Sequence, residues 1–127
     1  MAYEEILTSI TIPASADLSA YQFRAVKLGA TGAALAGAGE AAIGILQDNP
    51  NALGVPANVA VAGISKLWVT GAISINGAIR SSTVGIGVAS STGGTPYVFA
   101  RAQEACSTGV TKVIPVLIVH EGPTSTA

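Results

Sequence analysis

Residues 55–70 read VPANVAVAGISKLWVT, and this stretch decides the fold class. It contains two runs, 55–62 and 64–70, on either side of Gly63. Both runs are rich in the β-branched and aromatic residues that strands favour, and neither shows the 3.6-residue apolar period of a helix. We therefore predict two strands here, separated at Gly63.

Strand signals of the same kind recur along the rest of the chain. Short alternating or apolar runs occupy 5–12, 20–28, 41–47, 84–89, 97–102 and 112–119. Asn76-Gly77 lies between two short apolar runs, which predicts a β-hairpin. Pro115 cannot donate to a ladder, so we expect it at a sheet edge or a bulge. Short strands with turn signals about every 8–12 residues predict a small all-β barrel or sandwich with no helix longer than two turns.

The length of 127 residues predicts one domain, 1–127. Pro13 and the small residues after it separate the first run from the rest, so residues 1–18 are interpreted as an extended N-terminal arm. The β body is expected over 19–119, and residues 120–127 as a polar tail.

The composition is apolar and sparsely charged. Half of the residues are hydrophobic, only 10% are charged, and the formal net charge is −1. Scattered basic residues leave no electrostatic footprint for nucleic acid. The glycine-rich stretch 28–46 contains Glu40 and is too weakly hydrophobic to span a membrane. So little charge favours a surface that partners cover, the alternative being a plain neutral surface.

The sequence offers little catalytic chemistry. Residues 37–42 (GAGEAA) fit a dinucleotide-binding glycine pattern, but Pro50 cuts short the helix such a site needs. The lone Cys106 and lone His120 are interpreted as a buried structural thiol and an exposed imidazole. The single cysteine excludes an intramolecular disulfide, and the acidic N-terminus does not resemble an export signal, so we expect synthesis in the cytoplasm. No cluster of metal ligands stands out, and we expect no enzyme, no cofactor and no metal site.

The order of segments resembles the small capsid decoration, or cement, proteins of tailed bacteriophages. That family has a strand ending in VKL, a GVLQ-like strand, an alternating AVAV strand followed by glycine and lysine, and an AxEAA segment before a final apolar strand. The matching segments here are 26–28 (VKL), 44–47 (GILQ), 59–66 (VAVAGISK) and 102–106 (AQEAC), and the resemblance spans roughly residues 18–119. Trp68 and Pro115 depart from the family pattern.

The resemblance implies a compact β fold without catalysis that binds the outside of an icosahedral head, usually as a homotrimer. The implied partners are the major capsid protein and the chain itself, and the implied location is the outer capsid surface of the virion. We expect the arm and one aromatic residue at the interfaces. These interface candidates are Tyr3, Ile6, Ile10, Ile12 and Trp68.

Two alternatives remain open. The arm's apolar face must be covered, and we expect residues 3–12 to pair with a neighbouring subunit or the capsid, the alternative being a first strand of the chain's own sheet. The chain could instead be a receptor- or glycan-binding module of a phage fibre or head appendage. Exposed Trp68, Tyr97 and Tyr21 on one face would favour that second class.

Overall fold

The structure is a computed structural model that describes residues 4–90 and 96–123. Within these ranges the chain forms nine strands and no helix, so the all-β prediction is confirmed. The strands are β1 (Glu5–Pro13), β2 (Ala25–Gly29), β3 (Gly32–Leu35), β4 (Gly44–Leu46), β5 (Pro56–Thr70), β6 (Ala78–Ser81), β7 (Gly87–Ala89), β8 (Tyr97–Ala102) and β9 (Thr111–Pro123). Among the described residues no helix has the length and hydropathy that a membrane span requires.

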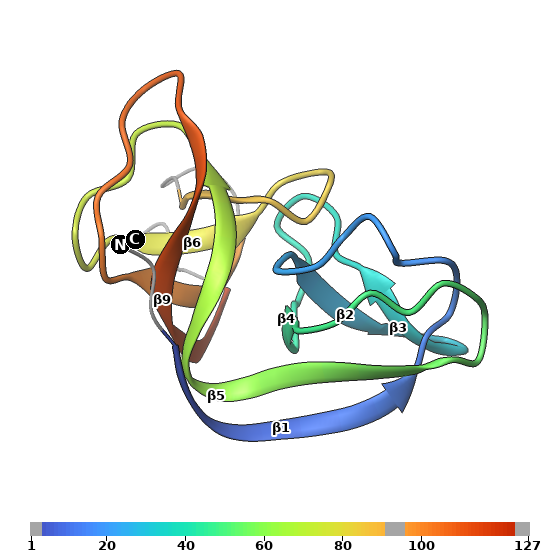
Figure 1. Cartoon of the computed structure of the whole chain (residues 1–127). Helices are drawn as coiled ribbons and strands as arrows, with labels where there is room; N and C mark the ends of the chain where they lie inside the picture. The colour runs from blue at the N-terminus through green and yellow to red at the C-terminus, as the bar shows by residue number, and fades with distance from the viewer. Residues whose placement is uncertain (1–3, 91–95, 124–127) are drawn as a thin grey trace.

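Five strands close into a barrel. They follow the order β5-β7-β6-β8-β9, and β9 pairs back onto residues 64–70 of β5. All contacts are antiparallel except the single parallel pairing of β7 with β5 at Val69. Figure 1 shows this barrel on one side of the molecule, with β2, β3 and β4 beside it.

β5 joins the barrel to the remaining strands. Its first half, 56–64, pairs with β1 and also contacts β4, which continues into β2 and β3. The two strands predicted around Gly63 are therefore one strand of 15 residues. Gly63 has φ +102, a conformation that L side chains rarely adopt, so the strand continues through it only because it is glycine. Figure 1 shows β5 turning from one part of the molecule into the other.

The core consists of two clusters of buried side chains. The barrel cluster includes Phe99, Leu67 and Ile114, all fully buried. The second cluster lies where β2, β4 and the first half of β5 meet, and it includes Ala14 and Leu18. The predicted arm, 1–18, is thus too long, because Ala14 and Leu18 are buried between the other elements and belong to the core.

The chain before β2 differs from its predicted strand. Only residues 25–28 of the run 20–28 are in a strand, which continues to Gly29. Phe23 has φ +64, which breaks the extended conformation of the chain. Its main chain connects β4 and β5: its amide donates a hydrogen bond to Leu46 O, and its carbonyl accepts one from the amide of Trp68. Alternation alone could not reveal this turn, because it depends on main-chain partners far along the chain.

The predicted Asn-Gly hairpin is also wrong. Ile73 bridges to Cys106, whereas β6, which follows the turn, pairs with β7 and β8. The amide of Gly77 donates to Ser74 O, so Asn76, with φ +65, stands third in the turn. A left-handed residue in third place is the signature of a type II turn, which does not impose hairpin pairing of the flanking runs.

The last strand extends beyond its prediction. β9 runs to Pro123, so residues 120–123 of the predicted polar tail belong to the barrel, and 124–127 lie outside the described residues. Pro115 lies beside the end of β8, where its carbonyl accepts a hydrogen bond from the amide of Gln103. Because β8 ends at Ala102, the N–H that proline lacks is not needed for a ladder hydrogen bond. The prediction of an edge position therefore holds only on the β8 side of β9, where the β8–β9 pairing ends; on the other side Pro115 stands opposite Lys66 of β5.

Candidate interaction surface

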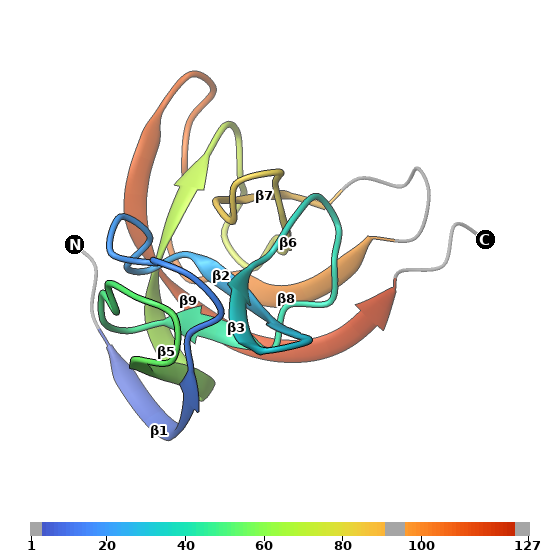
Figure 2. The same cartoon turned by 90° about the vertical axis from the view of Figure 1, so that its right-hand side faces the viewer.

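β1 lies on the outside of the molecule. Within residues 4–90 and 96–123 the strand pairs with β5 alone, antiparallel, from Glu5 opposite Ile64 to Pro13 opposite Pro56. Figures 1 and 2 both show it along the margin of the sheet, with β5 on its inner side. Within one chain this segment therefore pairs at its inner edge with its own sheet, which is the alternative named above. Its outer edge keeps the row of main-chain groups that an added strand can use.

β1 also exposes large apolar side chains. Leu7 is 76% exposed, and Ile6 and Ile10 are 38% and 39% exposed. Ile12 packs partly against the second cluster. Three of the predicted interface candidates therefore lie along one exposed edge strand, and Tyr3 falls outside the described residues.

Sequence reasoning missed Leu7, the most exposed of these side chains. The β1–β5 register shifts on both sides of Thr8, so the strict alternation of the sequence is interrupted there. Such an irregularity changes the direction in which side chains point, and the alternating sequence pattern does not reveal it.

Trp68 lies on the outer face of the β5–β9 pair. It is half-buried and stands opposite Val113, while its neighbours in β5, Leu67 and Val69, point into the barrel. Beside it, the Lys66 ammonium lies 5.6 Å from the centre of the Phe23 ring. Trp68 is thus a surface residue of the barrel, on a different element from the exposed residues of β1.

Trp68, Tyr97 and Tyr21, the three aromatic residues that would form a glycan platform, pack in different environments. Tyr97 packs against the barrel cluster, and Tyr21 packs against the second cluster. The Arg24 guanidinium stacks on Tyr21 at 5.1 Å from the ring centre. None of these contacts of the described residues favours the glycan-binding alternative.

All six basic side chains have partners within the chain. Four form ion pairs with glutamates, at nitrogen–oxygen distances of 2.8–3.7 Å. The pairs are Lys27–Glu40, Lys66–Glu4, Arg101–Glu121 and Lys112–Glu104. Arg24 and Arg80 donate to main-chain carbonyls. A binding partner therefore meets few positive charges that are not already paired. What β1 offers to such a partner is main-chain hydrogen bonding along its outer edge and contact with its exposed apolar side chains.

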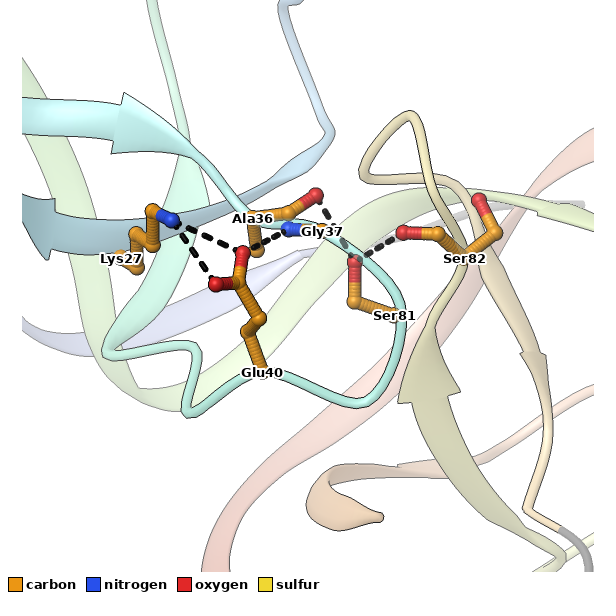
Figure 3. Close-up of polar contacts among 6 residues, drawn as sticks. All are labelled: Lys27, Ala36, Gly37, Glu40, Ser81 and Ser82. Carbon is orange, nitrogen blue, oxygen red and sulfur yellow. Dashed lines mark hydrogen bonds and ion pairs between the residues drawn. The ribbon is translucent and has the colours of Figure 1, made fainter.

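Glu40 shows how such a pair fixes a loop (Figure 3). Its carboxylate accepts two bonds from the Lys27 ammonium, at 2.8 and 2.9 Å, and one from the amide of Gly37, at 2.6 Å. At the start of this loop, Ala36 O lies 3.2 Å from the buried hydroxyl of Ser81, the last residue of β6, which also lies 2.9 Å from Ser82 O. The glycine pattern 37–42 is therefore part of a loop between β3 and β4 that the Glu40 side chain holds in place. The element that follows it is the strand β4, and not the helix that a dinucleotide site requires.

Glu40 makes the loop sensitive to acid. The Lys27 hydrogen bonds, and then the Gly37 amide, hold the pKa of Glu40 below its usual value. A lowered pKa stabilises the fold above the range in which an unfolded glutamate titrates, and that contribution disappears as pH falls through the folded pKa.

We therefore expect Glu40→Gln to flatten the acid limb of the stability profile. Urea midpoints measured at pH 6 and at about pH 3 should converge relative to those of the wild type, since glutamine does not titrate in this range. Lys27→Met, which removes the main cause of the shift, should flatten the profile in the same way. Unchanged acid sensitivity in both variants would contradict the role given to this pair.

Cys106 and His120 lie on different elements with different partners. Cys106 is buried in the loop after β8, where its thiol is 3.5 Å from Val110 O. His120 lies in β9 and its Nε2 is 3.0 Å from Val61 O of β5. Among the described residues no three histidine, cysteine, aspartate or glutamate side chains gather where they could hold a metal ion.

Comparison with known proteins finds no match: no family model, no curated protein and no solved structure is similar to this chain.

Proposed function

We propose that this chain is a non-catalytic structural protein that binds the outer surface of a tailed-phage head and stabilises contacts between major capsid proteins. The order of sequence segments supports the family. The structural observation that supports it most is β1, an edge strand with exposed Leu7, Ile6 and Ile10. Soluble proteins usually blunt such an edge with lysine, charge or a short strand, and β1 has nine residues with one charged residue, Glu5.

The physical logic is strand addition combined with mass action. An extended segment of a capsid protein can pair with the outer edge of β1, where main-chain hydrogen bonds supply affinity and the apolar side chains supply register. A protein that binds only the assembled shell stabilises that shell. A homotrimer multiplies weak single contacts, and we propose this state on the capsid. The protein is then made in the host cytoplasm and resides on the virion surface.

Heads prepared without the protein provide the test. We expect the purified wild-type protein to co-sediment with them, and Leu7→Lys to weaken binding at least tenfold, because a buried unpaired ammonium opposes strand addition. Ile75→Lys is the matched control: Ile75 is 69% exposed, in the turn before β6. It should bind like the wild type.

Ionic strength gives a second readout. Because four of the six basic side chains already form ion pairs with glutamates of the chain, binding should change little between low and high salt. Wild-type protein that fails to sediment with heads contradicts the proposal, as does equal binding by Leu7→Lys. A steep loss of binding with salt would show that charge, not the β1 edge, makes the contact.

A further inference from the structure

We propose that β1 exchanges between copies of this chain, so that in the oligomer β1 of one copy pairs with β5 of the next. The inference rests on the self-association proposed above and names the segment that makes it. It does not depend on capsid binding.

The first argument is that β1 is held by its ladder and little else. Of its large apolar residues only Ile12 packs against a core cluster, while Ile6, Leu7 and Ile10 remain exposed. The ladder itself is irregular on both sides of Thr8. A strand whose side chains do not fill the core opens at a lower free energy than the body to which it is attached.

The second argument is that the chain immediately after β1 is firmly fixed. Ala14 is fully buried and exchanges main-chain hydrogen bonds with the loop before β5. The amide and the hydroxyl of Ser15 both donate to Ala33 O, at 2.8 Å. A hinge at Pro13 can therefore swing β1 outward, and Ile12 is the large apolar residue of β1 that leaves the second cluster when it does so.

The third argument identifies the occupant. Departure of β1 unpairs one edge of β5 over 56–64, beside the fully buried Ala57 and Val59. The segment known to fit this edge, in register, is β1 itself, and a second copy supplies it. Exchange then recovers the same ladder bonds and the Glu4–Lys66 ion pair. When each copy gives one strand and receives one, the ring closes, as a trimer requires.

A disulfide across the ladder distinguishes exchange from the closed chain. Thr11 stands opposite Asn58, and the amide and carbonyl of Asn58 are bonded away from β1, to Asp48 and Gln47. The pair is therefore a non-hydrogen-bonded one, with Cα atoms about 4.5 Å apart, a spacing that accepts a disulfide. The test protein is Thr11→Cys/Asn58→Cys in a Cys106→Ser background.

Exchange predicts that oxidation of the concentrated protein gives covalent dimers and trimers on a non-reducing gel, which reduction returns to single chains. Dilution before oxidation should shift the product toward intrachain disulfides. Each single-cysteine variant, oxidised in parallel, should give no covalent trimer.

Only intrachain disulfides at every concentration would overturn the exchange. If light scattering then shows an oligomer, the self-association stands and uses another surface. If it shows a monomer, the exchange is equally wrong, and capsid binding is judged by sedimentation alone. Failure of any disulfide to form would contradict the β1–β5 register and with it the exchange.

Discussion

Phe99→Ala is expected to lower the free energy of unfolding by about 3–5 kcal/mol, the usual cost of truncating a buried phenylalanine. Phe99 is fully buried in the barrel cluster and is among the largest side chains so placed. Its strand, β8, pairs with β6 on one side and β9 on the other, so the walls of the cavity cannot collapse easily. A loss of this size is a large fraction of the roughly 5–15 kcal/mol that stabilises a typical domain.

Urea unfolding followed by tryptophan fluorescence, with Trp68 as the single reporter, measures this change. Leu28→Ala is the control: Leu28 is an apolar strand residue that is 64% exposed, and its truncation should change stability by less than about 0.5 kcal/mol. Similar losses in the two variants would show that the barrel interior is not the centre of the fold.

Gly63→Ala is expected to cost about 2–4 kcal/mol, because it combines backbone strain with a steric clash. Gly63 has φ +102, and an added Cβ would collide with Glu5 O and Leu7 N of β1. The variant must either distort β5 where it passes from the barrel to the second cluster or push β1 off its ladder. Hydrogen exchange should therefore show faster exchange of the β1 amides than in the wild type.

Gly54→Ala separates the two contributions. Gly54 has φ +84 in the loop before β5, and nothing lies within 4 Å of its added Cβ. This variant should lose only the cost of a left-handed alanine, about 1–2 kcal/mol, with β1 protection unchanged. Equal losses at the two positions would mean that close packing of β1 against Gly63 contributes nothing.

Local sequence patterns predicted the strand content well. The run 97–102 coincides with β8, and 5–12 lies within one residue of β1. Pairing was harder to predict. β2 and β3 form a hairpin whose ends meet at Gly29 and Gly32, although no strand was predicted over residues 32–35. A period-two pattern tells which residues share a face but not which strand lies beside another.

The candidate surface was predicted in part. The apolar residues of the N-terminal strand pointed to Ile6 and Ile10, which are exposed as an interface requires. The sequence could not show that β5 pairs with the inner edge of β1, because β2, β3 and β4 lie between the two strands along the chain and no tight turn connects them. Leu7 was missed because the register irregularity at Thr8 depends on both strands.

The copy number of this chain in purified phage heads tests the central proposal most directly. Quantitative mass spectrometry of heads carrying the protein would compare it with the major capsid protein. A cement protein that decorates the shell should be present in numbers comparable to the capsid subunits and should disappear from the particles in a Leu7→Lys mutant phage. A handful of copies per particle, or none, would contradict a role as a cement protein of the shell.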